Sequence, residues 1–269
     1  LTFGPDDMTE LKTMVLDGEG TASNGGSYTR DTSLFEKYRA AFARDGRIKR
    51  KLKVAAVCGN GTAGAFAPAI LRDLGCEVVE IDCALDFTFP NYNPNPEDMH
   101  MLKVMQDAVA KHGLDAAFGF DGDGDRCGVV DNKGQVIFAD KLGLMMARDM
   151  AAQHQNARFV VDVKSTGLFA NDPVLNAHGA SVEYYKTGHS YMKRRTSEIN
   201  AIAGFEKSGH FFFRAPYGLG YDDGIASALV ICRMLDNAPD KSLADLYAAL
   251  PVSWSSPSMS PHCDETKKY

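Results

Sequence analysis

Residues 52–81, LKVAAVCGNGTAGAFAPAILRDLGCEVVEI, place a glycine-rich turn and an apolar-striped helix between two short apolar runs. This order predicts a strand, a helix and a second strand. A similar order returns at residues 157–185, ARFVVDVKSTGLFANDPVLNAHGASVEYY, where Gly179 corresponds to Gly75. Alternating strands and helices predict α/β layers, and the repeat predicts two domains of similar topology.

The fold class that we predict is therefore α/β, with two similar α/β/α layered domains that carry mixed sheets and are arranged in tandem. A polar, Gly/Ser-rich stretch before the first domain is typical of a linker. With 269 residues, the chain is long enough for each domain to bury a core of its own. The predicted parts are a tail with linker at 1–32, the domains at 33–138 and 139–250, and the start of a further domain at 251–269.

Composition and charge exclude several classes of protein. The formal net charge is −6 at pH 7, whereas a nucleic-acid-binding surface needs a basic face. The sequence has no apolar run of the roughly 18 residues that a membrane span needs, and its first residues lack the pattern of a signal peptide. The six cysteines are scattered without a C-x-x-C pair, which favours buried thiols in a reducing compartment over a disulfide framework or a zinc site. We therefore expect a cytoplasmic protein without nucleic-acid or membrane partners.

The stretch FGFDGDGDRCGVV places Asp121, Asp123 and Asp125 in alternation with glycines between two apolar runs. Residues at i, i+2 and i+4 of an extended segment share one face, so the three carboxylates converge. Converging carboxylates repel unless a cation lies between them, and hard oxygen ligands select Mg²⁺ or Ca²⁺ over zinc. An EF-hand needs Gly and Glu where Arg126 and Asn132 stand. We predict a Mg²⁺ site with room for a phosphate, to which Arg126 would also bind; a solvated turn without an ion is the alternative.

The segment GFEKSGHFFF brings a carboxylate, a hydroxyl and an imidazole onto a glycine-flanked turn. These groups belong to Glu206, Ser208 and His210. A carboxylate accepts hydrogen bonds from two adjacent hydroxyls, so the set suits recognition of a polyol such as a sugar. A polar hairpin turn that binds no ligand is equally compatible with this stretch.

Basic side chains follow predicted strands of the second domain in VDVKST and YYKTGHSYMKRR. Ligands of open α/β sheets bind at the carboxyl ends of strands, and cations there suit a phosphate group. Lys164, Lys186 and His189 are therefore candidate phosphate contacts. The run 193–195 is more typical of a solvated helix face.

Two helices have N-terminal signals in the sequence. Asn95 is predicted to cap the helix that follows NPNPED, with Pro96 at its first position. Asp222 and Asp223 are predicted to cap the helix that begins in GYDDGIASALV.

The turn GNGTAG, from Gly59 to Gly64, follows a predicted strand and precedes a helix, and Asp82 ends the next strand. This arrangement is that of a dinucleotide-binding fingerprint. It is also compatible with a tight turn in which backbone packs on backbone. A nicotinamide-dependent oxidoreductase is therefore one alternative function, and a non-catalytic sugar-phosphate-binding module is another.

Four motifs together resemble those of the α-D-phosphohexomutase family, in particular its bacterial phosphomannomutase/phosphoglucomutase members. They are D-G-D-G-D-R at 121–126, K-T-G-H-S at 186–190, E-K-S-G-H at 206–210 and D-D-G at 222–224. The resemblance implies an isomerase of carbohydrate metabolism, an intramolecular phosphotransferase that interconverts the 1- and 6-phosphates of mannose, glucose or both. In this family a phosphoserine phosphorylates the sugar, and the bisphosphorylated sugar then returns its other phosphate to the serine.

The resemblance also implies roles for individual residues. The acidic loop would hold Mg²⁺ next to the phosphoserine, the E-K-S-G-H turn would hold sugar hydroxyls, and the G-N-G-T-A-G turn would be structural. Lys164 and His189 would lie near the transferring group. The candidate catalytic residues are Lys164, His189 and Arg126, the candidate substrate-binding residues are Glu206, Ser208, His210 and Lys186, and the candidate metal ligands are Asp121, Asp123 and Asp125.

Two departures from the family pattern limit the resemblance. The family's serine lies in a T-A-S-H-N-P loop, whereas Ser23 in GTASNGGSYT is followed by Asn-Gly-Gly, so we do not expect Ser23 to be the phosphoryl donor. Both ends of the sequence resemble cuts through structured segments. We expect a fragment with the family's second and third domains, which lacks the phosphoserine and is inactive without the first and last domains.

Overall fold

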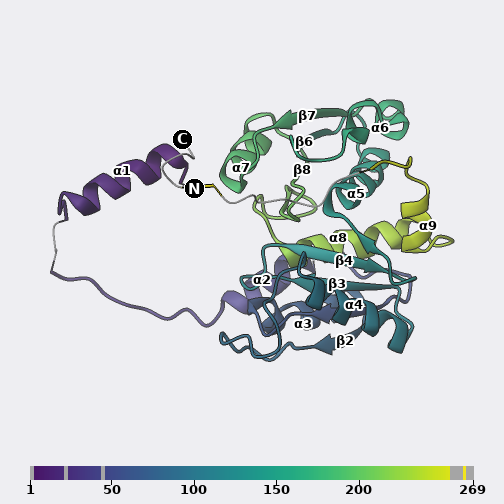
Figure 1. Ribbon diagram of the computed structural model, residues 1–269, viewed down its shortest axis with the longest axis horizontal. Helices are drawn as coiled ribbons and strands as arrows, with labels where there is room; N and C mark the ends of the chain where they lie inside the picture. The colour runs from purple at the N-terminus through teal and green to yellow at the C-terminus, as the bar shows by residue number, and fades with distance from the viewer. Residues whose placement is uncertain (1–2, 21–23, 44–45, 255–262, 265–269) are drawn as a thin grey trace.

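The computed structural model describes residues 3–20, 24–43, 46–254 and 263–264. Within these ranges, no helix combines the length and the apolar character that a membrane crossing requires. Figure 1 shows two sheets, one above the other, with the helix α8 (Gly224–Asn237) between them.

The first sheet has five strands in the order β2-β1-β3-β4-β5. β1 pairs in parallel with β2 and β3, and β4 pairs in antiparallel with β3 and β5. α3 and α4 lie on opposite faces, since α3 packs with one set of alternating strand residues and α4 with the other. The elements are β1 (Lys53–Val57), the 3₁₀ helix η1 (Thr62–Ala65), α3 (Ala67–Leu74), β2 (Glu77–Ile81), α4 (Met99–His112), β3 (Ala116–Phe120), β4 (Cys127–Asp131) and β5 (Val136–Ile137).

The second sheet has four strands in the order β7-β6-β8-β9. β6 pairs in parallel with β7 and β8, and β9 returns in antiparallel to β8. Met192 of α7 packs on Val160 and Phe212, on the face opposite to α5 and α6. The elements are α5 (Ala139–Gln153), β6 (Arg158–Asp162), the 3₁₀ helix η2 (Gly167–Asn171), α6 (Pro173–Ala177), β7 (Ser181–Tyr185), α7 (His189–Glu198), β8 (Ala203–Phe205) and β9 (Phe211–Phe213).

The two sheets repeat one layout. β2-β1-β3-β4 of the first sheet corresponds to β7-β6-β8-β9 of the second, with parallel pairs followed by one antiparallel return. The loop between β3 and β4 therefore occupies the same topological position as the loop between β8 and β9. The predicted fold class, two similar α/β/α layered domains with mixed sheets, is confirmed.

α8 comes late in the sequence but packs on the first sheet. Its side chains lie in the same continuous apolar cluster as Val54 and Phe118, and Cys232 Sγ lies 3.8 Å from Cys76 Sγ. The expectation that each domain buries a core of its own holds only in part: the faces of the two sheets turned towards α8 share this cluster, whereas the opposite face of each sheet packs in a cluster of its own. Almost every residue of α8 is buried, because an all-round apolar helix can be covered by both sheets at once.

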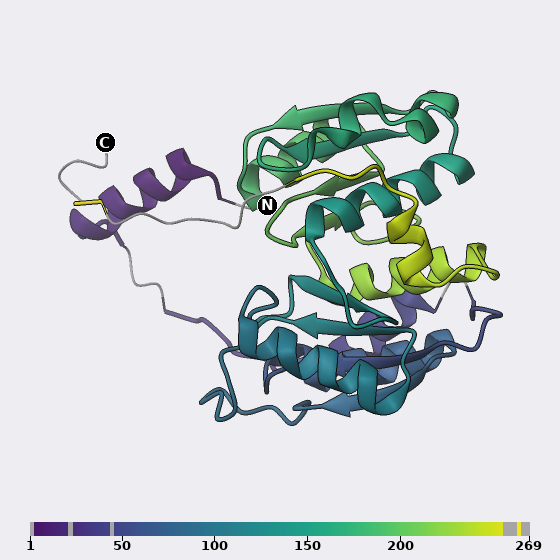
Figure 2. The ribbon, with the colours of Figure 1, turned by 45° about the vertical axis from the view of Figure 1, so that its right-hand side comes forward.

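Three further helices complete the described part of the chain. They are α1 (Pro5–Leu16), α2 (Leu34–Phe42) and α9 (Leu243–Ala248). α2 packs against the start of α3 through aromatic contacts such as Tyr38 with Phe66. α1 has no buried residue and lies apart from both sheets in Figures 1 and 2, although Asp7 pairs with Arg194 of α7 at 2.8 Å.

Candidate functional site

The acidic loop, residues 121–126, joins β3 to β4 and is organised by its first aspartate. Asp121 is 2% exposed, and its Oδ1 accepts hydrogen bonds from the backbone N–H groups of Gly124 and Arg126, both at 3.1 Å. Its Oδ2 accepts from Arg126 Nε at 2.6 Å. Gly124 has φ of +83°, a backbone conformation that a side chain disfavours. The loop thus curls around one buried carboxylate.

The three aspartates of the acidic loop converge. Oxygens of Asp121, Asp123 and Asp125 lie within 4.8 Å of one another, with Asp121 buried, Asp125 half-buried and Asp123 exposed. Burial raises the pKa of Asp121, even though Arg126 favours its charged form. Three hard oxygen donors on one loop, with an open side at Asp123, fit the coordination that Mg²⁺ prefers.

The E-K-S-G-H turn, residues 206–210, joins β8 to β9. Glu206 is 2% exposed, and its Oε1 accepts a hydrogen bond from Gly188 N at 2.6 Å. Ser208 Oγ lies 2.9 Å from His210 Nδ1. Burial raises the pKa of Glu206. The turn therefore holds a carboxylate, a hydroxyl and an imidazole together, as the sequence predicted.

The acidic loop and the E-K-S-G-H turn contact each other directly, although they belong to different sheets. Arg126 and His210 form an antiparallel backbone bridge, and Cys127 N donates to Gly209 O at 3.4 Å. His210 Nε2 lies 3.3 Å from Asp125 Oδ1. Burial disfavours a charged imidazole, but the Asp125 contact and nearby carboxylates outweigh burial and raise the pKa of His210. One site thus combines both loops.

The start of α8 is the third part of this site. Asp223 caps the helix, since its carboxylate accepts from Ala226 N at 2.9 Å, as predicted. Asp222 does not cap the helix, but a carboxylate oxygen of Asp222 lies within 4.8 Å of ligand atoms of Asp125 and His210. Its Oδ1 pairs with Lys193 Nζ at 2.8 Å, whereas its Oδ2 is buried without a hydrogen-bond partner among the described residues.

The pairing with Asp222 corrects the interpretation of Lys193 as part of a solvated helix face. The Lys193 side chain is only 20% exposed, because α7 turns this residue towards the start of α8. The other two residues of the run also pair with carboxylates: Arg194 pairs with Asp7, and Arg195 pairs with Glu183 at 2.8 Å.

The remaining candidates lie on two loops beside the E-K-S-G-H turn. His189 is exposed at the start of α7, and its ring stacks on that of His210 with centroids 6.4 Å apart. Lys186 is exposed, with its Nζ 5.5 Å from the centroid of the Tyr191 ring. Lys164 is exposed two residues after β6. The structure thus brings His189 to the site and leaves both lysines on exposed loops.

Asp162 is a site residue that sequence reasoning missed. It is fully buried at the end of β6, and its carboxylate accepts from Ser165 Oγ at 2.6 Å and from Thr187 Oγ1 at 3.1 Å. It also accepts from Lys207 N at 3.3 Å. One carboxylate therefore ties together the loops that carry the candidate residues. The only signal for it was an aspartate at the end of an apolar strand.

The G-N-G-T-A-G turn supports the acidic loop. Thr62 donates to Gly122 O through its backbone N (3.0 Å) and its Oγ1 (3.1 Å). A Cβ on Gly64 would meet Cys83 O at 2.2 Å, so only glycine fits there. The Asp82 carboxylate accepts from Asn91 and Tyr92. These contacts favour the structural interpretation of the turn over the dinucleotide fingerprint.

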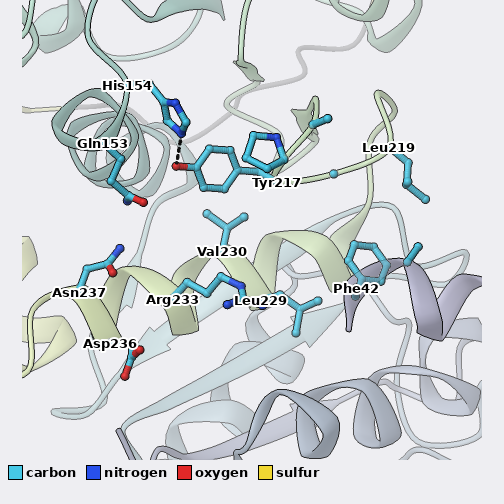
Figure 3. Close-up of a pocket in the computed structure, with 14 residues that line it drawn as sticks. Phe42, Gln153, His154, Tyr217, Leu219, Leu229, Val230, Arg233, Asp236 and Asn237 are labelled. Carbon is cyan, nitrogen blue, oxygen red and sulfur yellow. Dashed lines mark hydrogen bonds between the residues drawn. The ribbon is translucent and has the colours of Figure 1, made fainter. Parts of the chain in front are cut away.

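Two cavities lie near these elements. One, of about 570 Å³, is lined by Asp123 and Asp125 of the acidic loop together with Asp222 and residues of α2. The other, of about 580 Å³, lies between α2, α5 and α8, where His154 Nε2 and Tyr217 Oη are 3.1 Å apart (Figure 3). Because only the first cavity adjoins the acidic loop, we place the candidate site there.

Comparisons with known proteins identify the family. Residues 36–134 match the model of phosphoglucomutase/phosphomannomutase alpha/beta/alpha domain II, and residues 138–253 match the model of domain III. The chain therefore belongs to the phosphoglucomutase/phosphomannomutase family.

Individual relatives agree with the family models. The chain is 35% identical over 250 residues to a phosphomannomutase/phosphoglucomutase of Pseudomonas putida, an alignment that covers 93% of this chain and 52% of the relative. A crystal structure of a family protein from Burkholderia thailandensis superposes with a TM-score of 0.83 at 31% identity, covering 95% of this chain and 54% of that one. An Aspergillus fumigatus N-acetylphosphoglucosamine mutase in complex with GlcNAc-6P and magnesium shares the fold, with a TM-score of 0.57, 15% identity and coverage of 83% of this chain and 51% of that one. The chain thus spans about half the length of the curated relatives it matches.

Proposed function

We propose that this chain is the Mg²⁺- and sugar-binding part of a phosphohexomutase, which interconverts the 1- and 6-phosphates of mannose, glucose or both. The direct contact between the acidic loop and the E-K-S-G-H turn carries the proposal, because a cation held by the loop would lie next to groups that would bind a polyol. The names of the relatives support this activity. A phosphoserine donor and a bisphosphorylated sugar intermediate belong to the proposal.

The acidic loop would supply the metal. Asp121, Asp123 and Asp125 would hold Mg²⁺, which neutralises charge on a transferring phosphoryl group when bound. Magnesium in the Aspergillus fumigatus mutase supports the choice of ion. Arg126, fixed by its contact with Asp121, would bind phosphate oxygens from the same loop.

The E-K-S-G-H turn would bind the hexose. The carboxylate of Glu206 would accept hydrogen bonds from two sugar hydroxyls, while Ser208 and His210 would bind a neighbouring hydroxyl. Lys164, Lys186 and His189 lie on adjoining loops and would contact the phosphate. Burial disfavours the ionised form of Glu206, and hydrogen bonds donated by the sugar hydroxyls would stabilise that form.

The donor serine is not assigned to a residue of this chain. Ser23, which we reject as the donor, lies outside the residues that the structure describes. The division into parts at 1–32, 33–138, 139–250 and 251–269 remains a proposal. Residues 255–262 and 265–269 of the last part also lie outside the described residues.

Exchange of Glu206 tests the proposal in a longer protein that contains these residues. Glu206→Gln keeps the shape but weakens acceptance from the sugar hydroxyls, so coupled assays should give a lower kcat/KM on mannose 1-phosphate and glucose 1-phosphate. Glu198→Gln, on the exposed surface of α7, is the matched control. Unchanged rates in Glu206→Gln would contradict the sugar-binding role.

A thermal-shift comparison separates the proposal from the two alternatives. Mg²⁺ and glucose 1-phosphate should stabilise the phosphohexomutase, since a ligand that binds only the folded state raises the unfolding temperature. NAD⁺ should give no shift. A shift with NAD⁺ alone would favour the oxidoreductase, and glucose 1-phosphate binding without any effect of Mg²⁺ would favour the non-catalytic binding module.

A further inference from the structure

Two thiols that the proposed function does not use lie side by side at the edge of the first sheet. Cys58 follows β1 and is fully buried, and Cys83 follows β2 and is partly exposed. Their Sγ atoms are 3.5 Å apart. Residues 84–88, directly after Cys83, are exposed, whereas Cys83 Sγ also lies 3.4 Å from Ala56 O.

The backbone geometry permits a bond between these sulfurs. Hydrogen bonds between the two segments continue past the strand ends, from Cys58 N to Ile81 O (3.1 Å) and from Asn60 N to Asp82 O (2.7 Å). Neighbouring strands run about 4.8 Å apart, and disulfides span Cα separations of about 4.4–6.8 Å. Closing the Sγ separation to a bond of about 2 Å requires a movement of only about 1.5 Å.

The two thiols also differ in reactivity. The contact between the two sulfurs lowers the pKa of Cys83. The same contact, together with burial, raises the pKa of Cys58. Cys83 is therefore the better nucleophile, and Cys58 is placed to resolve a mixed disulfide.

We propose that Cys58 and Cys83 form a reversible intramolecular disulfide by exchange with a small disulfide such as glutathione disulfide. The Cys83 thiolate attacks one sulfur of the reagent, which forms a mixed disulfide and releases one thiolate. The Cys58 thiol then loses its proton to solvent and attacks Cys83 Sγ, which releases the second thiolate. Two protein thiols lose two electrons and two protons in total, and one small disulfide is reduced to two thiols.

A second cysteine pair provides an internal contrast. Cys76 and Cys232 are nearly as close, with Sγ atoms 3.8 Å apart, but both are buried where α8 packs on the first sheet. The contact with Cys76 and burial raise the pKa of Cys232. Proximity alone therefore does not make a pair reactive, and this pair should stay reduced under conditions that oxidise Cys58 and Cys83.

The disulfide would form next to the candidate site. Cys58 directly precedes the G-N-G-T-A-G turn, in which Thr62 donates twice to Gly122 O of the acidic loop. Asn60 of the same turn binds the segment after β2 through Ala84 O at 2.7 Å. A covalent bond between the two segments would thus fix the backbone on which the acidic loop rests.

Thiol counting and peptide mapping test the proposal on the full chain with Cys263→Ser, which removes the exposed thiol near the C-terminus. After incubation of the reduced, folded protein with glutathione disulfide, the number of free thiols measured in denaturant should fall by about two. Mass spectrometry should locate one cross-link between Cys58 and Cys83, and dithiothreitol should reverse it. No loss of thiols, or a cross-link between Cys76 and Cys232 instead, would overturn the proposal.

Two further variants are the controls, made in the same Cys263→Ser background. Cys83→Ser removes the attacking sulfur at a partly exposed position, so it should fold and form no cross-link. Cys232→Ser leaves the reactive pair intact and should oxidise like its parent. A cross-link that survives in Cys83→Ser would contradict the assignment of the attacking sulfur. The mapping on the parent protein decides the proposal even if a variant fails to fold.

Discussion

Gly224 allows α8 to approach the acidic loop closely, so Gly224→Ala should disturb the contact between this helix and the loop. Gly224 N donates to Gly124 O at 3.0 Å. A Cβ at this position would lie 2.6 Å from Arg126 O and 2.8 Å from Gly124 O. Both partners are backbone atoms, so the added methyl group can be accommodated only if the helix or the loop moves.

The magnitude follows from two opposing effects. Overpacking of this kind costs about 1–3 kcal/mol, whereas Gly→Ala stabilises by about 0.4–1 kcal/mol through the unfolded chain. The net loss should be about 1–2 kcal/mol, which corresponds to a fall of about 2–8 °C in the unfolding temperature of a domain of this size. Hydrogen exchange at the amides of Gly124 and Arg126 should also become faster, since both amides donate to Asp121 Oδ1.

Gly167→Ala is the matched control for thermal unfolding. Gly167 also follows an N-cap residue, at the start of η2, but a Cβ there would meet nothing within 4 Å. The control should be as stable as the parent chain or slightly more stable. Equal unfolding temperatures for Gly224→Ala and Gly167→Ala, with unchanged amide exchange in the acidic loop, would refute the close approach of α8 to that loop.

Two further changes test a buried carboxylate, Asp162, and a half-buried one, Asp149. Asp162→Asn replaces an acceptor of three hydrogen bonds and should lower the free energy of unfolding, measured in urea, by about 2–3 kcal/mol. The control Asp107→Asn, on the exposed surface of α4, should change this free energy little. Equal losses in the two variants would contradict the role of Asp162. Burial raises the pKa of Asp149 above its usual 3.8, so the contribution of this carboxyl to stability falls as pH rises through that region. The free energy of unfolding of Asp149→Asn, relative to that of the parent chain, should therefore be higher at about pH 7 than at about pH 4. Urea unfolding curves that give the reverse order would contradict the burial argument.

The layered fold was predictable because its signals are local. Each repeat places a glycine with positive φ after its first helix, Gly75 at +116° and Gly179 at +66°, between apolar strands. The acidic loop and the E-K-S-G-H turn were predictable for the same reason, since each is a run of consecutive residues whose side chains a single turn brings together. Patterns of this kind need no knowledge of tertiary contacts.

Helix boundaries show where local signals compete. The sequence offered Asn95 as a cap, but α4 begins at Met99 and Asp98 caps it. Asn95 instead accepts from Glu97 N at 3.1 Å and lies 3.4 Å from Arg126 Nη1. Asn95 and Asp98 are both suitable caps. Asn95, which lies nearer the acidic loop, stabilises the turn before α4, and Asp98 caps the helix.

The parts that the sequence could not supply depend on distant contacts. Asp162 binds Thr187 and Lys207, which lie 25 and 45 residues away in the chain. α8 lies late in the sequence but packs on the first sheet, and its apolar pattern does not indicate which sheet it contacts. Lys193 faces Asp222 only because α7 and the start of α8 pack together. Such pairings are set by tertiary structure and leave no periodic signal.

Mg²⁺ binding by the acidic loop is the most direct test of the proposed site. Isothermal titration calorimetry of the chain should show one saturable Mg²⁺ site. Asp123→Asn, which removes an exposed ligand, should bind about tenfold or more weakly, while the surface control Asp107→Asn should bind like the parent chain. Equal Mg²⁺ affinity in all three proteins, or no binding by the parent chain, would contradict the assignment of the acidic loop as the metal site.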